Sequence, residues 1–271
     1  MNEYKSIPIG MEDFKEVIDK NCYLVDKTLL IKDILDGGAK VTLFTRPRRF
    51  GKTLNMSMLR RFFEKTEEDH SYLFNGLAIT KTGDKYQSHM GQYPVISISL
   101  KSMKQSDYQE AFSEFKNMIS KEIWRHKELL VADKLMPLSR KKLEMICNDT
   151  ADNSVYNTAL KLLSDCLYEV YGKKVIVLID EYDVPLENAY FNGFYDKMIN
   201  LIRSVFESVL KTNDSLEFGV LTGCLRISKE SIFTGLNNLN VHSITDNAFS
   251  QYFGFTEQEV KQLADYYGLS N

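Results

Sequence analysis

The segment between Val41 and Thr53 constrains the fold of this 271-residue chain more than any other. An apolar, β-branched strand is expected at 41–45, and it leads through a short basic loop into Gly51-Lys52-Thr53. Apolar residues then recur at helical spacing, at Leu54, Met58, Leu59, Phe62 and Phe63. A strand, a loop and a helix in this order are the context of a phosphate-binding P-loop. One residue departs from the P-loop pattern G-x-x-x-x-G-K-[ST]: this chain has Arg46 at the position of the first glycine.

The loop nevertheless keeps the groups that bind phosphate. In a P-loop, backbone N–H groups and a helix N-terminus converge on the phosphates. Gly51 allows the close backbone approach, Lys52 is expected to reach the β- and γ-phosphates, and Thr53 is expected to offer its hydroxyl to Mg²⁺. We therefore predict a nucleotide-binding run composed of Arg46, Pro47, Arg48, Arg49, Phe50, Gly51, Lys52, Thr53 and Leu54.

A second acidic element strengthens this interpretation. Asp180 follows the unbroken apolar run 175–179, which is typical of a strand buried on both faces of a parallel sheet. An aspartate at that position anchors Mg²⁺ in P-loop NTPases. Glu181 comes next and is predicted to polarise the attacking water. An acidic loop that merely caps a strand is the alternative, and the P-loop upstream makes it the weaker one.

A third strand, expected at 216–222, ends in Thr222. A hydroxyl at that strand end can contact the γ-phosphate or the attacking water, and Arg226 can stabilise charge in the transition state. Asp183 is a further candidate, expected to support the residues that contact the nucleotide without contacting the nucleotide itself. For Thr222 and Arg226 the alternative is an ordinary strand end followed by an exposed arginine.

The order of elements predicts an α/β fold with a doubly wound, mainly parallel sheet of about five strands flanked by helices. Because a strand at 95–100 falls between Thr53 and Asp180 in sequence, we expect the P-loop division that has an additional strand between the two nucleotide-binding strands and a catalytic glutamate.

Residues 1–250 are expected to form the core, with 1–40 as an N-terminal helical extension. Thr256 to Glu259 form a capping box that starts a helix over 257–267. We interpret 251–271 as the start of a helical lid that is cut off, with a natural end as the alternative.

Composition limits the partners and the cellular location that we expect for this chain. The formal net charge of −3 gives no overall attraction to nucleic acid, so such a contact would have to be local. No stretch approaches the roughly 18 apolar residues of a membrane span, and the N-terminus lacks the apolar region of a signal peptide. The four cysteines show no metal-ligand spacing. These features predict a cytoplasmic protein with no membrane partner.

Several motifs together resemble the AAA-ATPase-like family, found mainly in bacteria and often fused to a C-terminal PD-(D/E)XK-type nuclease domain. The matching segments are 23–28, 46–53, 93–95, 178–185, 221–238 and 253–256. The resemblance implies that arginine is the usual residue at position 46, that Lys52 and Thr53 bind phosphate and Mg²⁺, that Asp180 anchors the metal and that Glu181 activates water. By this comparison we expect the sequence to be the ATPase portion of a longer protein, without the nuclease domain or a complete lid, and a naturally short member is the alternative. Segment 23–28 recurs upstream of the P-loop in the family, and we expect it to contact the nucleotide base or the sheet edge.

Three functions follow as hypotheses. The first is an ATP-binding, Mg²⁺-dependent ATPase that drives a conformational switch and controls an associated nuclease module. The second is a nucleotide-binding interaction module with negligible turnover. The third is a DNA-binding module that uses the arginines of the loop.

Overall fold

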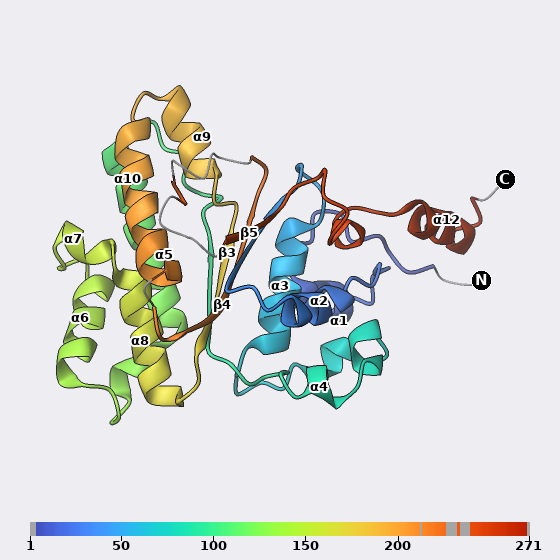
Figure 1. The fold of residues 1–271 in the computed structure, drawn as a ribbon, viewed down its shortest axis with the longest axis horizontal. Helices are drawn as coiled ribbons and strands as arrows, with labels where there is room; N and C mark the ends of the chain where they lie inside the picture. Colours follow the sequence, from blue (N-terminus) through green and yellow to red (C-terminus); the bar gives the residue numbers. More distant parts are fainter. Residues whose placement is uncertain (1–3, 212, 226–231, 234–238, 270–271) are drawn as a thin grey trace. The chain divides into compact units, whose positions relative to one another are not determined.

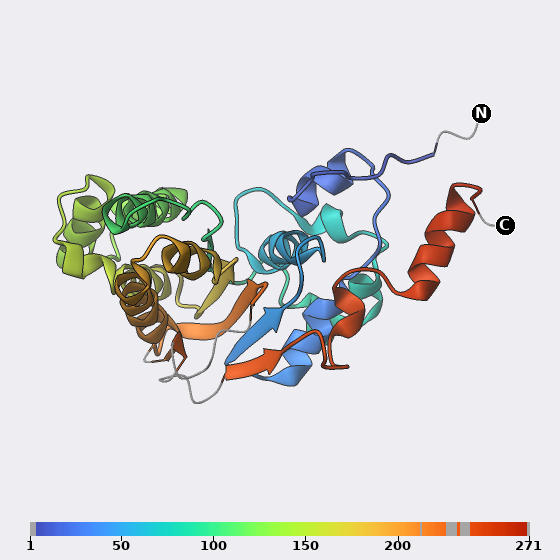
Figure 2. The same cartoon turned by 90° about the horizontal axis from the view of Figure 1, so that it is seen from above.

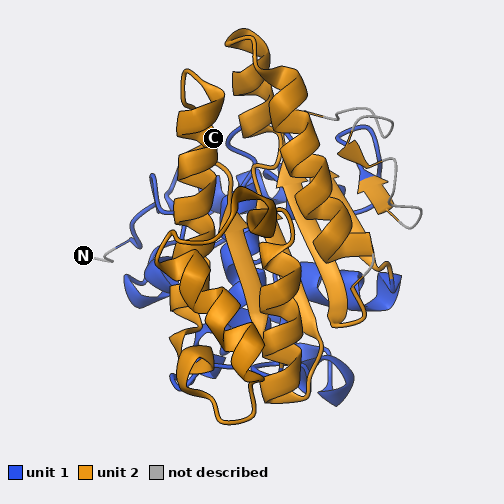
Figure 3. Cartoon of the chain, turned by 90° about the vertical axis from the view of Figure 1, so that its left-hand side faces the viewer, with its two compact units in different colours: residues 1–38, 46–92, 242–271 blue, residues 39–45, 93–241 orange. Residues whose placement is uncertain are grey.

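The computed structural model describes residues 4–211, 213–225, 232–233 and 239–269. The chain divides into two units, coloured separately in Figure 3. Unit 1 contains residues 1–38, 46–92 and 242–271, and unit 2 contains 39–45 and 93–241. Each unit is therefore built from segments that are distant in sequence.

Unit 2 is built on a parallel sheet. Its strands are β1 (Val41–Thr45), β2 (Val95–Ser99), β3 (Val175–Asp180) and β4 (Leu216–Gly223). The sheet order is β2-β3-β4-β1-β5, and the pairs β2/β3, β3/β4 and β4/β1 are parallel. All six residues of β3 are buried, as its unbroken apolar run predicts. The α/β fold with a mainly parallel, five-stranded sheet is confirmed.

The additional strand between β1 and β3 is β4. The sequence predicted such a strand, but on the basis of residues 95–100. That segment forms β2, which pairs with the other side of β3. The fifth strand of the sheet is β5 (Leu239–His242).

The helices of unit 2 pack on one face of these strands (Figures 2 and 3). They are α5 (Tyr108–Arg125), α6 (Pro137–Cys147), α7 (Asn153–Tyr156), α8 (Ala159–Tyr171), α9 (Val184–Phe191) and α10 (Tyr195–Phe206). Apolar residues at helical spacing on α5, such as Phe115, Ile119 and Ile123, are fully buried in the core. Two residues, Asn157 and Thr158, separate α7 from α8, and α10 is followed by a π-helical turn, Glu207–Lys211.

Unit 1 is mainly helical. Its elements are α1 (Phe14–Asp19), α2 (Leu29–Gly37), α3 (Lys52–Phe63), α4 (Asp84–Gln87) and α12 (Glu257–Tyr266), with 3₁₀ turns at Ser71–Phe74, Ala78–Lys81 and Ser250–Tyr252 (Figure 1). The ring of Phe14 stacks on Phe74, and Phe62 meets Phe74 edge-on, which joins α1 and α3 through one aromatic cluster. The capping box predicted for α12 is present at Thr256 and Glu259.

Among the residues that the structure describes, no helix is both long and apolar enough to cross a membrane.

A buried charged group joins the end of α5 to β2. The Glu122 carboxylate accepts the N–H of Ser97 at 2.7 Å and the Nε–H of Arg125 at 2.9 Å. The His126 ring nitrogen lies 3.1 Å from the carbonyl oxygen of Val95. Burial alone would lower the pKa of His126, but the carboxylates of Glu122 and Glu128 raise it above its ordinary value.

This raised pKa predicts a pH dependence of stability. A group whose pKa is raised by folding stabilises the fold at pH values below its unfolded pKa, and that contribution is lost as the pH rises through the folded pKa. Urea unfolding of the wild type and His126→Gln should therefore differ most near pH ~6, and the difference should shrink towards pH ~9. His89→Gln, outside this group, is the control. A difference that grows with pH would contradict the assignment.

Candidate active site

The loop that the sequence predicts to bind phosphate, residues 46–51 and called the phosphate loop below, belongs to unit 1. It begins at Arg46, the residue after β1. Gly51 has φ +75° and is the N-terminal cap of α3. A side chain at this position would meet nothing within 4 Å, so the backbone conformation rather than space requires glycine. The first hydrogen bond of α3 runs from the Asn55 N–H to the Gly51 carbonyl at 2.9 Å. The first-turn N–H groups have no intrahelical partners, which makes such a helix start suited to anions.

Lys52 is the first residue of α3 and is buried, with 6% of its surface exposed. Its ammonium donates to the carbonyl oxygens of Arg46 and Pro47 at 2.9 and 3.0 Å. The lysine therefore returns across the loop to its first two residues. Thr53 and Leu54 follow in the first turn and are half-buried.

The three arginines of the loop occupy different environments. Arg48 and Arg49 are exposed, whereas Arg46 is buried. The Arg46 guanidinium donates to the His242 carbonyl at 2.8 Å and lies 5.1 Å from the centre of the Phe253 ring. Only Arg48 and Arg49 thus present their charge at the surface of the loop.

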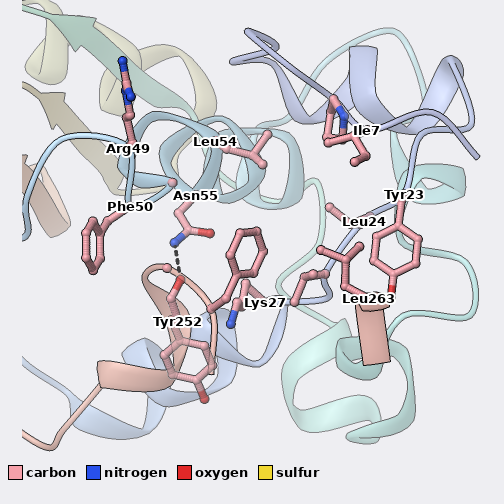
Figure 4. Close-up of a pocket in the computed structure, with 15 residues that line it drawn as sticks. Ile7, Tyr23, Leu24, Lys27, Arg49, Phe50, Leu54, Asn55, Tyr252 and Leu263 are labelled. Carbon is pink, nitrogen blue, oxygen red and sulfur yellow. Dashed lines mark hydrogen bonds between the residues drawn. The ribbon is translucent and has the colours of Figure 1, made fainter. Parts of the chain in front are cut away.

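A cavity of about 240 Å³ lies beside the loop, within unit 1 (Figure 4). Three segments line it: the N-terminal stretch with Tyr23, Leu24 and Lys27, the start of α3 with Leu54, and the C-terminal stretch from Tyr252 to Leu263. Its lining is mainly apolar, with 13 of the 15 lining residues lacking a charge. Segment 23–28, whose role the sequence left open between base and sheet edge, thus contributes to a pocket next to the loop.

Two polar contacts hold the wall of this pocket. The Asn55 Nδ2 donates to the Tyr252 carbonyl at 2.8 Å, the bond drawn in Figure 4. Lys27 donates to Glu259 at 2.6 Å, which ties segment 23–28 to α12. Burial alone would raise the pKa of Glu259, but the Lys27 ammonium holds it below its ordinary value.

The second group of predicted residues lies in unit 2, at the carboxyl ends of β3 and β4. The register pairs Ile179 with Leu221, so Asp180 and Thr222 follow on adjacent strands. The Thr222 hydroxyl donates to Asp180 Oδ1, and the same oxygen accepts the Glu181 N–H at 3.0 Å. Both side chains are buried. The structure therefore brings together the predicted metal anchor and the predicted hydroxyl.

Glu181 has φ +53°, a left-handed conformation that is unfavourable for a residue other than glycine. Such strain costs about 1–3 kcal/mol and clusters at functional sites. Of the five described non-glycine residues with positive φ, two, Arg49 and Glu181, belong to the predicted site. The backbone at Glu181 therefore supports a functional role for this residue independently of the sequence motif.

Tyr182 and Asp183 fix the chain that follows β4. The buried Asp183 carboxylate accepts the N–H groups of Cys224 and Leu225 at 2.9 and 2.7 Å. The Tyr182 N–H donates to the Thr222 carbonyl at 3.1 Å, and its hydroxyl donates to the Leu225 carbonyl. The sequence indicated Asp183 as a supporting residue, but nothing in it pointed to the role of Tyr182.

Arg226, the predicted transition-state arginine, lies outside the described residues. The described residues contain no group of three or more His, Cys, Asp or Glu side chains that could hold a metal ion. Mg²⁺ at a nucleotide usually keeps phosphate and water ligands and takes only one or two protein groups. The Thr53 hydroxyl and the buried Asp180 carboxylate are hard oxygen donors of the kind that Mg²⁺ prefers.

A family model described as "Predicted AAA-ATPase" (AAA-ATPase-like) matches residues 8–233, most of the chain. The chain belongs to this family. A protein of Azotobacter chroococcum mcd 1, named "Uncharacterized protein in vnfD 5'region", is 29% identical over 259 residues. That alignment covers 94% of this chain and 44% of the relative, so the chain spans under half of the relative's length. No solved structure matches the chain.

The match to the AAA-ATPase-like family includes the phosphate loop, Asp180, Glu181 and Thr222. The family description points to nucleotide binding and ATPase activity. The C-terminal stretch that lines the pocket and contacts Arg46 lies beyond the matched residues.

The packing of Gly223 gives a test of the strand ends. A Cβ at Gly223 would lie 2.5 Å from the Tyr182 ring and 2.7 Å from Asp183 Oδ1. Gly223→Ala should therefore lower the free energy of unfolding by about 1–3 kcal/mol, measured by urea denaturation. At Gly37 an added Cβ meets nothing within 4 Å, so Gly37→Ala should be neutral or stabilising by up to about 1 kcal/mol. Equal effects of the two substitutions would contradict this packing.

Proposed function

We propose that the chain binds ATP with Mg²⁺ and hydrolyses its terminal phosphoanhydride bond. The observation that carries the proposal is the phosphate loop itself. A left-handed glycine starts α3, and a lysine at the first helical position returns across the loop. This arrangement suits a polyphosphate because helix N–H groups and an ammonium meet at one place.

The proposed reaction is an in-line attack of water on the γ-phosphorus. The first turn of α3 and Lys52 bind the β- and γ-phosphates. Thr53 and Asp180 are the side chains that would hold Mg²⁺, and the ion would supply charge to offset the charge that develops on the phosphoryl oxygens. Glu181 orients the water and takes its proton as the bond to the bridging oxygen breaks, which yields ADP and phosphate. Thr222 fixes the Asp180 carboxylate by the hydrogen bond that it donates.

The cavity beside the loop supports a site for the nucleobase. Its apolar lining suits a flat ring, and it adjoins the glycine that starts the phosphate site. We extend the proposal to a conformational switch that acts on a further module of a longer protein, such as a nuclease domain. Support for this extension is the family resemblance together with the shorter span of this chain relative to the Azotobacter protein.

Loss of single functional groups tests hydrolysis. Lys52→Ala should abolish phosphate release because it removes the ammonium from the phosphate site. Glu181→Gln should retain ATP binding and lower the turnover number by about 10²–10⁴-fold, the usual contribution of a general base. Glu144→Gln makes the same chemical change at an exposed position of α6 and should leave turnover unchanged. Unchanged turnover in Glu181→Gln would contradict the mechanism and favour a binding module.

Filling the cavity tests the nucleobase site. Leu24→Trp should weaken ATP binding about tenfold, since the contacts of a base are worth roughly 1–3 kcal/mol. Binding of inorganic tripolyphosphate should be unchanged, because it needs only the phosphate loop. Calorimetry with both ligands gives the comparison. Equal losses for ATP and tripolyphosphate would place the base elsewhere.

A further inference from the structure

Arg46 occupies the position where the P-loop pattern has its first glycine. In this loop the left-handed backbone falls on Arg49 and Gly51, with φ +71° and +75°, and Arg46 is not among the described residues with positive φ. The first loop position therefore has a conformation that any residue can adopt. Arginine costs no backbone strain there, so its side chain can serve another purpose.

The Arg46 side chain is directed to a distant part of the chain. The residue is 2% exposed, and its guanidinium donates to the His242 carbonyl at 2.8 Å and lies over the Phe253 ring at 5.1 Å. Burial lowers its pKa, although an arginine stays charged at neutral pH. Burying a guanidinium is costly, and the contacts with the His242 carbonyl and the Phe253 ring offset part of that cost.

The same C-terminal segment, residues 242–254, contacts the loop at two further points. The Gly254 N–H donates to the Phe50 carbonyl at 3.1 Å, and the Tyr252 carbonyl accepts from Asn55 on α3 at 2.8 Å. Gly254 has φ +76°, and a Cβ there would approach the Phe50 ring to 3.0 Å. The segment thus follows the loop from its first residue to the first turns of α3, all within unit 1.

The Arg46 backbone connects these contacts to the phosphate site. Its carbonyl oxygen accepts the Lys52 ammonium at 2.9 Å, while its side chain holds segment 242–254. Displacement of Arg46 would therefore move a carbonyl that positions the lysine.

We propose that Arg46 is a positioning residue that fixes the phosphate loop to the C-terminal segment 242–254 and thereby sets the place of Lys52. In this role it acts on the phosphate site through the loop. This inference deepens the proposed function and rests on it for the ligand. It also makes segment 242–254, which lies beyond the matched family region, part of the nucleotide site.

The sharpest test is Arg46→Gly, which restores the G-x-x-x-x-G-K-T pattern. If arginine were a defect, this substitution would tighten ATP binding. We expect it instead to weaken binding of Mg²⁺-ATP about tenfold, the size expected for losing one buried charged hydrogen bond and a cation–π contact. Arg46→Lys keeps the charge without the planar guanidinium and should recover part of the affinity.

Hydrogen exchange separates this role from general destabilisation. In the nucleotide-free protein, Arg46→Gly should increase exchange in residues 249–254 relative to peptides from β3. Arg140→Gly is the matched control, because Arg140 also donates to a backbone carbonyl, that of Ala132, but on α6 of unit 2. It should leave both ATP affinity and exchange in 249–254 unchanged.

The outcomes distinguish this inference from the proposed function. Wild-type affinity in Arg46→Gly, or unchanged exchange in 249–254, would overturn the role of Arg46. Failure of the wild type to bind ATP would overturn the proposed function, whereas increased exchange in Arg46→Gly would still support the attachment of the loop to the segment.

Discussion

The parallel register of β1, β4 and β3 is the constraint on which the rest of the structure depends. Because these strands run in the same direction, their carboxyl ends lie at one edge of the sheet. Phe44 is paired with Thr222, and Ile179 with Leu221. The chain therefore leaves β1 at the same edge of the sheet where β3 ends in Asp180 and β4 in Thr222 and Gly223. A shift in the β3/β4 pairing would separate the hydroxyl of Thr222 from the Asp180 carboxylate that it contacts.

Two residues of the predicted site have an unfavourable backbone conformation. Glu181 and Arg49 have left-handed backbones without being glycine. Such conformations persist only where the surroundings hold them. At Glu181 the turn is held on both sides, by its own N–H to Asp180 and by the Tyr182 N–H to Thr222. Tyr182 and Asp183 also hold Leu225 through hydrogen bonds. Their side chains fill the space beside Gly223, the last residue of β4, so that no side chain fits there.

Local patterns predicted much of this protein. The apolar run of β3, the strand before Arg46 and the capping box of α12 depend on neighbours in sequence, so the residues themselves reveal them. The phosphate loop and the pair Asp180–Glu181 were visible for the same reason. The sequence placed Asp180 and Thr222 at strand ends, but it predicted a contact of the Thr222 hydroxyl with phosphate or water and not its hydrogen bond to Asp180.

The contacts that the sequence did not predict join distant segments. The Arg46 side chain meets His242 and Phe253, almost two hundred residues later, and no spacing rule connects them. An additional strand between the two nucleotide-binding strands was expected, but it was attributed to residues 95–100, because sequence order does not give the order of strands in a sheet.

The central claim is that this chain binds a nucleoside triphosphate through its phosphate loop. Calorimetric titration with ATP, ADP and GTP in the presence of Mg²⁺ tests it most directly. The account predicts saturable binding of ATP at one site per chain, with ADP competing for it. Absence of measurable heat and of competition for all three nucleotides would contradict the claim.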